Sequence, residues 1–482
     1  MKSRLASLLA MSALLTGCSF APAYHVPQSA PTPEQYKEQD GEHAGWKVAQ
    51  PQDSQPRGSW WTLFNDPQLN DLEGKLENAN LSLQAAFARL QQARAQYRIA
   101  RADLFPSLTA NPSATRERFS SNAPRFLPGF PTTYNDFVLG ADLSYEVDLW
   151  GRVRNEVAAA KATQQASAAD LAATDLSLRA ELAEDYFDLR TDDAAVQVLD
   201  QTVEEYRKAL ELTANLFSGG AAALTDVAQA QAQLQTALTQ AADMRLQRAQ
   251  AEHAIALLIG ANPSSFSLAA NPLPLDVVPP PLDPGLPSEL LERRPDVAEA
   301  ERRVASANAQ IGQARAAYFP QFTLSAAAGF ESVSTATWIK APSRFWSVGP
   351  HVSLPLFEGG RLVAQTDQAK AAYAEQVANY RNTVLGAYRD VEDNLAALRQ
   401  LQAESETAAG AVSATGTVLQ QAQDRYKAGI ATYLEVASAE TAALQAQLTV
   451  VNIQTRRMNA SVLLVKALGG GWQAPWPALG KQ

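Results

Sequence analysis

The chain has 482 residues, of which 46% are hydrophobic and 19% are charged, and this composition excludes a disordered protein. The formal net charge of −10 argues against a nucleic-acid-binding protein, because contacts to phosphate need clustered Lys and Arg. Past the N-terminal residues no apolar run approaches the roughly 18 residues of a membrane-spanning helix, so any crossing of a membrane would have to be made by strands.

The N-terminus is typical of a secretory signal. Lys2 and Arg4 precede a short apolar stretch that ends at Leu-Thr-Gly-Cys18, and this stretch is too short to span a membrane and remain there. Cys18 is the only cysteine of the chain, which rules out an internal disulfide. Residues 1–17 are therefore predicted to be a signal peptide.

Leu-Thr-Gly-Cys at this position resembles the bacterial lipobox. The resemblance implies that Cys18 becomes the first residue of the mature chain and carries a covalent lipid, with an N-acyl chain such as palmitate and an S-diacylglycerol group. Ser19 stands where an aspartate would favour the inner membrane, so the outer membrane is the implied destination. Several acyl chains on one residue make a durable anchor. The alternative is an incidental cysteine that is removed with the signal peptide.

The stretch ARADLFPSLTA, residues 100–110, predicts a helix that ends and runs into a strand, and ARAAYFPQFTL, residues 314–324, repeats the pattern. Pro106 and Pro320 suit the first residue of a strand, where no ladder donor is needed. Apolar and polar residues alternate with a period of two, which predicts strands, over residues 137–149, 322–330 and 346–356.

Strands of this length suit a transmembrane barrel with an apolar outer face and a polar lumen. A soluble sheet with one wet face gives the same alternation, so the pattern alone leaves both open. Each half of the chain supplies two strands, and four cannot close a membrane barrel, whose smallest examples have about eight. In a membrane the chain must therefore pool strands with copies of itself, and an aqueous conduit favours a trimer over a dimer, because about eight strands leave an interior filled by side chains.

Two stretches without proline, between Pro131 and Pro263 and between Pro355 and Pro475, are dominated by good helix formers. A glycine-containing turn interrupts each stretch, at residues 217–227 and 426–436. These turns align at an offset of 209 residues, and the two Phe-Pro junctions align at 214. The chain is thus predicted to be an internal duplication, each half running helix, strand, strand, helix, turn, helix.

The helix before each turn carries apolar residues at a spacing of seven, with one polar break at Ser405. Such a seam keeps facing a partner only if the helices supercoil left-handedly, although an ordinary buried helix face is the alternative. From Arg152 to Phe217 the helix would extend roughly 99 Å, which no compact domain contains. A long antiparallel coiled-coil hairpin, present twice, is predicted. The seam positions are Leu182, Leu189, Val196, Val203, Leu210 and Phe217, and then Val391, Leu398, Ser405, Val412, Leu419 and Tyr426.

WWTLFNDPQLNDLEGKLENAN, residues 60–80, and LPSELLERRPDVAEAE, residues 286–301, look like signatures of the TolC-like outer membrane factors. Over nearly all of its mature length the chain resembles their lipoprotein channels of resistance-nodulation-division (RND) efflux systems, the NodT type. The resemblance implies a mixed α and β membrane protein, a trimeric channel whose twelve-stranded β-barrel, with four strands per chain, continues into a long α-helical coiled-coil tunnel in the periplasm. It implies a passive conduit that exports small molecules such as drugs, as a homotrimer in outer membrane lipid, with a periplasmic adaptor and an inner-membrane RND transporter.

The predicted organisation follows from these assignments. The signal peptide covers residues 1–17, and a lipid-anchored equatorial segment covers 18–65. The first repeat covers 66–262, an equatorial proline-rich linker 263–287, the second repeat 288–470 and a C-terminal tail 471–482. Asp66 and Pro67 suit the N-cap and first position of the opening helix.

The resemblance places a periplasmic gate at the two hairpin turns, around Gly219, Gly220 and Gly429. Asp226 is expected to bond across the hairpin interface with Tyr426 as a partner, and Glu435 to line the lumen and favour cations. Ala431 and Ser438 replace an arginine and an aspartate of the family pattern, so a link through those two side chains is unavailable. The alternative is that Asp226 and Glu435 are ordinary carboxylates of a first helical turn, stabilised by the dipole by about 0.3–1 kcal/mol.

No enzyme is expected. The four histidines, His25, His43, His253 and His351, lack the spacing of metal ligands, and the chain has neither a glycine-rich phosphate loop nor a G-x-S-x-G motif. No cofactor other than the lipid and no nucleic-acid partner is expected. A periplasmic adaptor would carry one hairpin between β-rich halves, and a structural coiled-coil lipoprotein would not need the strands, so both remain weaker alternatives.

The lipobox predicts that Cys18 is the mature N-terminus and carries the lipid. Mass spectrometry of the N-terminal peptide of the purified protein should find Cys18 first and acylated. An unmodified terminus at any other residue would contradict this. Cys18→Ala should impair sorting and assembly more than it abolishes membrane residence.

Overall fold

The computed structural model describes residues 19–29, 36–38, 58–120, 122, 131–282 and 293–470. The predicted signal peptide, Cys18 and the C-terminal tail lie outside these residues, as do parts of the N-terminal segment and of the proline-rich linker. The chain divides into two units that each draw on both repeats. Unit 1 comprises Met1–Gln28, Arg89–Ala168 and Glu299–Arg381, and unit 2 comprises Ser29–Ala88, Ala169–Ala298 and Asn382–Gln482.

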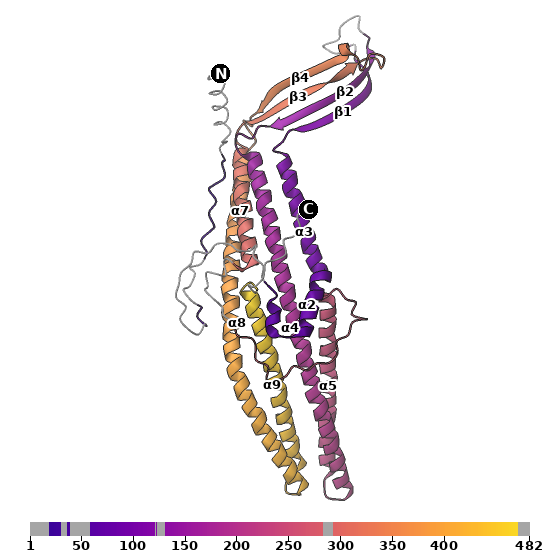
Figure 1. Ribbon diagram of the computed structural model, residues 1–482, viewed down its shortest axis with the longest axis vertical. Coiled ribbons are helices and arrows are strands. Elements are labelled where there is room, and N and C mark those ends of the chain that lie inside the picture. The colour runs from indigo at the N-terminus through magenta and orange to yellow at the C-terminus, as the bar shows by residue number, and fades with distance from the viewer. Residues whose placement is uncertain are drawn as a thin grey trace. The chain divides into compact units, whose positions relative to one another are not determined.

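Unit 1 contains an antiparallel sheet of four strands in the order β1-β2-β3-β4 (Figure 1). The central pair, β2 and β3, joins the first repeat to the second, and the described residues pair β1 and β4 on one side only. Both edges of the sheet are therefore open, and the predicted four strands per chain are confirmed. The strands are β1 (Ser107–Arg118), β2 (Thr133–Glu146), β3 (Gln321–Ser332) and β4 (Arg344–Ser353), with the short helix η2 (Ala341–Ser343) before β4.

The Phe-Pro junction of the second repeat is the anchor of a small aromatic cluster. Phe319 stacks on Phe20 with ring centroids 4.3 Å apart, and the ring of Trp150 lies 5.1 Å from Phe319 and 6.2 Å from Phe20. The indole N–H of Trp150 donates to the carbonyl oxygen of Pro320 at 2.7 Å. The junction of the first repeat has no such cover, since Phe105 is 63% exposed.

The residues that follow Cys18 lie along helix α7 (Pro295–Ala316). The amide of Asn308 donates to the carbonyl oxygen of Pro22 at 2.9 Å. A Cβ on Gly312 would lie 2.8 Å from the Cα of Ala21, so the backbone can approach the helix this closely only because Gly312 has no side chain. Ala21 and Pro22 are thus held against α7 within unit 1.

Two helical hairpins repeat the same dimensions. The first helix of each hairpin has 67 residues and the second has 35 residues. Every boundary in the second hairpin lies 209 residues after its counterpart in the first. No helix among the described residues has the length and apolarity needed to cross a membrane. The helices are α4 (Arg152–Ser218) and α5 (Leu224–Leu258), then α8 (Arg361–Lys427) and α9 (Tyr433–Ala467).

The heptad seam predicted for α4 is buried or half-buried as far as Leu210. Leu182, Leu189 and Val203 are almost fully buried, and the equivalent Val391 of α8 is also buried. The last position departs from the prediction, because Phe217 is 44% exposed at the end of α4. The last covered position of the α4 seam is therefore Leu210, about two turns before the end of the helix.

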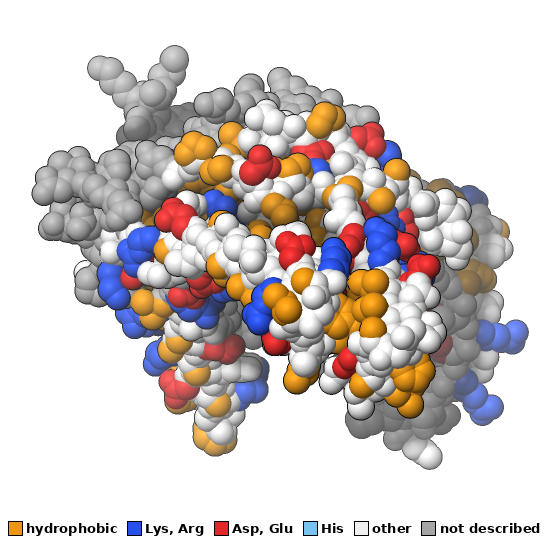
Figure 2. Space-filling view, turned by 90° about the horizontal axis from the view of Figure 1, so that it is seen from below, with side chains coloured by type: hydrophobic (Ala, Val, Ile, Leu, Met, Phe, Trp, Pro, Cys, Tyr) orange, Lys and Arg blue, Asp and Glu red, His pale blue; other side chains and the backbone are white. Residues whose placement is uncertain are grey.

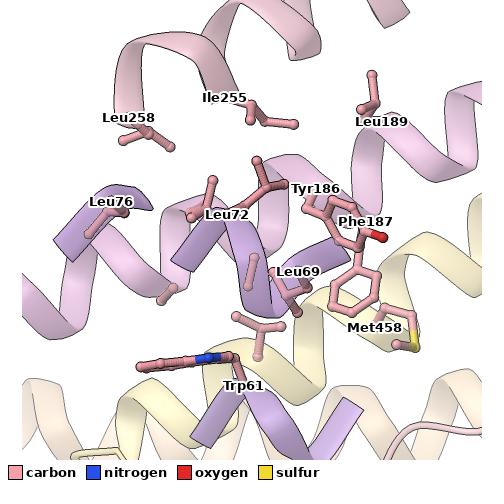
Figure 3. Close-up of a cluster of buried hydrophobic side chains, with 14 of the residues drawn as sticks. Trp61, Leu69, Leu72, Leu76, Tyr186, Phe187, Leu189, Ile255, Leu258 and Met458 are labelled. Carbon is pink, nitrogen blue, oxygen red and sulfur yellow. The ribbon is translucent and has the colours of Figure 1, made fainter. Parts of the chain in front are cut away.

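The largest core of unit 2 forms where the N-terminal helices meet three helices of the repeats (Figure 3). Trp61 of η1 (Trp60–Phe64) and three leucines of α2 (Pro67–Ala79) pack against side chains of α4, α5 and α9. Helix α3 (Leu81–Ala102) follows α2 directly. The labelled core residues are Trp61, Leu69, Leu72, Leu76, Tyr186, Phe187, Leu189, Ile255, Leu258 and Met458.

The start of α2 is fixed by the predicted cap. The carboxylate of Asp66 accepts hydrogen bonds from the backbone N–H of Gln68 at 2.9 Å and of Leu69 at 3.2 Å, and Pro67 is the first helical residue. The same carboxylate accepts a hydrogen bond from the hydroxyl of Tyr186 at 2.8 Å. The N-cap thus also ties α2 to α4, and the prediction for Asp66 and Pro67 is confirmed.

A glycine closes each repeat in the same way. Gly260 follows α5 with φ +67°, and a Cβ there would lie 2.5 Å from the carbonyl oxygen of Ala79. Gly469 follows α9 with φ +87°, and its Cβ would lie 2.9 Å from the carbonyl oxygen of Arg293. Both positions need a left-handed backbone and direct contact with another backbone, and only glycine provides both.

A side chain from the start of each repeat completes this closure. In the first repeat the amide of Asn80 donates to the carbonyl oxygen of Leu258 at 2.7 Å. In the second repeat the guanidinium of Arg294 donates to the carbonyl oxygen of Ala467 at 3.2 Å. Arg294 also forms ion pairs with Asp296 and Asp390, which gives the Arg-Arg-Pro-Asp-Val motif a structural role. The C-terminal carbonyls of α5 and α9 are thereby satisfied.

Gly469→Ala should lower the free energy of unfolding by more than about 1 kcal/mol, because the new methyl group meets a backbone carbonyl at a positive φ. Gly416→Ala is the matched control, since Gly416 lies in the exposed interior of α8 with open space around it. That control should raise stability by about 0.5–1 kcal/mol. Thermal unfolding in detergent, followed by circular dichroism, measures the stability of both variants. Equal changes in melting temperature would contradict the close contact between Gly469 and Arg293.

Candidate functional site at the hairpin tips

The two hairpin turns of unit 2 have the same backbone structure. Gly220 and Gly429 both adopt φ +74°, which suits glycine at the end of a helix. In the first turn the N–H of Ala221 donates to the carbonyl oxygen of Leu216 at 2.8 Å, and in the second turn Ile430 makes the equivalent bond at 3.0 Å. Gly219 has no positive φ, so the turn does not require glycine there.

A buried aromatic cluster lies directly behind the turns, where the two hairpins pack on each other. Tyr426 of α8 and Tyr433 of α9 are in edge-to-face contact with ring centroids 5.5 Å apart. The hydroxyl of Tyr426 donates to the hydroxyl of Thr213 on α4 at 3.3 Å. Ala230 of α5 belongs to the same cluster, so all four hairpin helices contribute.

Asp226 lies in the first turn of α5. Its carboxylate accepts a hydrogen bond from the backbone N–H of Ala223 at 3.3 Å, which is the bond that an N-terminal carboxylate makes to cap its own helix. Within this chain Asp226 and Tyr426 are therefore not bonded to each other, because Asp226 accepts from Ala223 and Tyr426 donates to Thr213. A bond between Asp226 of one chain and Tyr426 of another stays a prediction.

Glu435 lies in the first turn of α9 beside the last turn of α8. Its carboxylate is 3.4 Å from the guanidinium of Arg425, and both side chains are about half exposed. An exposed pair of this kind contributes little to stability. The pair does place the positive charge of Arg425 beside Glu435, and the sequence analysis did not predict this. Ser438 is exposed on the same helix and Ala431 is half-buried in the turn.

A further carboxylate, Glu440, was missed by the sequence reasoning. It is only 3% exposed, and the hydroxyl of Tyr433 donates to it at 3.2 Å. Burial raises the pKa of Glu440 to about 7, the hydrogen bond from Tyr433 opposes this rise, and the charge of Glu205 adds to it. Tyr433 and Glu440 are seven residues apart, so the heptad spacing could have revealed that they share a face.

Helix α4 carries a stripe of half-buried carboxylates in unit 2. Burial, together with acidic neighbours, raises the pKa of Asp185 and of Asp192 to about 7. Burial also raises the pKa of Asp188, which accepts a hydrogen bond from the amide of Asn459 at 2.8 Å. With Glu181 these residues recur at helical spacing on one face of α4. No group of three or more residues among those described is arranged to hold a metal ion.

The chain combines a helical hairpin that occurs twice with a four-stranded sheet that is open at both edges. This combination is typical of a subunit that assembles with further copies of itself. The family model described as outer membrane efflux protein matches residues 73–261 and 286–470. The chain is 33% identical over 480 residues to the probable efflux pump outer membrane protein TtgC of Pseudomonas putida, covering 98% of this chain and 96% of that protein. It is 30% identical to the cation efflux system protein CusC of Escherichia coli, covering 95% of this chain and 97% of that one.

A solved structure of the outer-membrane channel OprN matches with a TM-score of 0.84 at 30% identity, covering 95% of this chain and 100% of that chain. The Campylobacter jejuni channel CmeC matches with a TM-score of 0.83 at 27% identity, covering 95% of this chain and 96% of that chain. The chain belongs to the outer membrane efflux protein family. It is a TolC-like outer membrane channel of an efflux system, and this confirms the family and the function predicted from the sequence.

The positions of Asp226 and Glu435 at the hairpin tips predict how their loss changes conduction. Asp226→Ala should raise the resting conductance, and Glu435→Ala should lower the preference for cations, the latter only modestly because Arg425 lies beside Glu435. Recording in planar lipid bilayers measures both. Asp243→Ala, on α5 well away from the turn, is the control and should conduct like the wild type. If all three variants match the wild type, the gate lies elsewhere and both carboxylates only stabilise their own helices.

Proposed function

We propose that the chain works as a homotrimer, the passive outer membrane conduit of a tripartite efflux pump, and exports small molecules such as drugs and toxic compounds. The observation that carries this proposal is the four-stranded sheet whose outer strands, β1 and β4, each pair on one side. Lipid cannot satisfy the free N–H and C=O groups of these edges. Strands of neighbouring copies would satisfy them, and three copies would supply twelve strands.

The hairpins of the three chains would then form the wall of a periplasmic tunnel. The carboxylate stripe of α4 supports a role in passing cations, because Glu181, Asp185, Asp188 and Asp192 bring several acidic groups to one helix face. Some relatives are named for the efflux of toluene or antibiotics and others for the efflux of cations. We propose that the channel itself is broadly permissive and that an inner-membrane RND transporter selects the cargo.

The hairpin tips support contact with a periplasmic adaptor. Leu224 is 65% exposed at the first tip, and Ile430 and Leu434 are 68% and 61% exposed at the second. In the view from below, hydrophobic, acidic and basic side chains are interspersed on the face turned to the viewer (Figure 2). Apolar side chains held at a turn and surrounded by charges suit a docking surface with a polar rim.

Lipid on Cys18 is also part of the proposal, although this residue lies outside the described part of the chain. The next residues support it, because the hydroxyl of Ser19 donates to Asn155 at 3.1 Å on α4 and Phe20 stacks on Phe319. These contacts would hold the acylated terminus close to the ends of the strands in unit 1. The anchor would then assist insertion of the sheet into the outer membrane.

Affinity purification of the protein from its own envelope after mild cross-linking should recover a periplasmic adaptor and an inner-membrane transporter. Leu434→Glu should reduce adaptor recovery at least about tenfold, because it puts a charge into the apolar contact. Leu246→Glu is the control, since Leu246 is 54% exposed on α5 far from the tip. Equal recovery with both variants would show that the tips do not bind the adaptor.

A further inference from the structure

The contact between the two hairpins contains a carboxyl group that the gate described above does not use. Glu440 of α9 is 3% exposed and lies behind the tips, on the face of α9 that packs against the first hairpin. Tyr433 on the same face is 1% exposed and donates its hydroxyl to Glu440 at 3.2 Å. Gln233 of α5 bridges to the carbonyl oxygen of Ala437 at 3.4 Å, which confirms that α5 and α9 are in contact here.

The groups that face Glu440 offer it no positive charge. From α4 these are Tyr206, whose hydroxyl is buried without a hydrogen-bond partner among the described residues, and the acidic Glu205. From α8 the cluster contains one titratable side chain, Tyr426, whose hydroxyl donates to Thr213. From α5 Gln233 is uncharged. No ion pair joins Glu440 to any residue in the described part of the chain.

We propose that Glu440 is a proton-sensitive lock between the two hairpins, closed when its carboxyl group is neutral and weakened when it ionises. A neutral carboxyl group still accepts the hydrogen bond from the Tyr433 hydroxyl and puts no net charge into this buried contact. A carboxylate at the same place would be a buried charge supported by one hydrogen bond only.

The direction of the pH dependence follows from linkage. Burial raises the pKa of Glu440 from an ordinary 4.5 to about 7, so the packed hairpins bind the proton more tightly than separated ones. Packing is therefore strengthened as the pH falls from about 7 towards 4.5, and it is weakest above pH 7. Between pH 5.5 and 8.5 the packing equilibrium should shift on the order of 30-fold.

The two repeats differ at this point, which suggests that the lock is a specific feature. The positions equivalent to Tyr433 and Glu440 in the first hairpin are Leu224 and Gln231, which cannot titrate. Leu224 is 65% exposed, whereas Tyr433 is buried. In the proposed trimer a chain thus carries one titratable contact, between its own hairpins. The further step from this contact to conduction rests on the proposed function.

Pulsed electron paramagnetic resonance on the full-length protein in detergent tests the lock directly. Spin labels on Ala228→Cys of α5 and Ala442→Cys of α9, both at exposed positions, report the separation of the hairpins. The protein without these two substitutions is the labelling control. We expect a single short distance at pH 5.5 and a broader, longer distribution at pH 8.5.

Glu440→Gln should keep the short distance at every pH, because the amide is always neutral. Tyr433→Phe should move the midpoint of the transition to higher pH, since it removes the hydrogen bond that favours the carboxylate. Glu435→Gln is the matched control on the same helix and should leave the transition unchanged, because Glu435 is about half exposed.

A wild-type distance that does not change with pH would overturn the proposal, and so would a transition that survives in Glu440→Gln. Bilayer conductance of the same samples should rise with pH in the wild type and not in Glu440→Gln. If the distances change as expected but no sample conducts, the lock stands and the proposed function fails.

Discussion

The sheet has two edges that the chain cannot close by itself. Its four strands pair in sequence order, which leaves the outer sides of β1 and β4 without partners among the described residues. In the outer membrane, where this family resides, unpaired backbone groups facing lipid are prohibitively unfavourable. The need to pair these edges explains why such a subunit would assemble with copies of itself. The proposed conduit follows from that assembly. Strands and hairpins belong to the same chain, so copies that pair their strands also bring their hairpins together.

The two halves of the chain share their hairpin dimensions, and they also share the way in which each repeat ends. Gly260 and Gly469 make the same left-handed closure, and Asn80 and Arg294 satisfy the equivalent helix ends at Leu258 and Ala467. The tips have diverged. The second hairpin buries Tyr433 and Glu440 against the first, whereas the first hairpin presents Leu224 to its surroundings. The asymmetry allows one contact to respond to protons while the fold stays symmetric.

Much of the fold could be predicted because it depends on local pattern. Period-two alternation located β2, β3 and β4 to within a few residues, although β2 begins at Thr133 rather than at 137. The start of β1 was predicted only from the Phe-Pro junction, and the proline-free stretches located both hairpins. The cap at Asp66 was predictable because it needs only its own neighbours. The contact of Gly469 with Arg293, the burial of Glu440 and the pair of Glu435 with Arg425 were not predictable in this way, since each depends on residues far along the chain or across a turn.

The account depends most on the number of chains that complete the sheet. Native mass spectrometry of the purified, detergent-solubilised protein measures this number directly. The open edges of β1 and β4 predict a mass three times that of the mature chain, with no stable monomer, and one conducting unit per trimer in a lipid bilayer. A monomer that is stable in detergent and conducts on its own would contradict the account, because four strands would then have closed without partners.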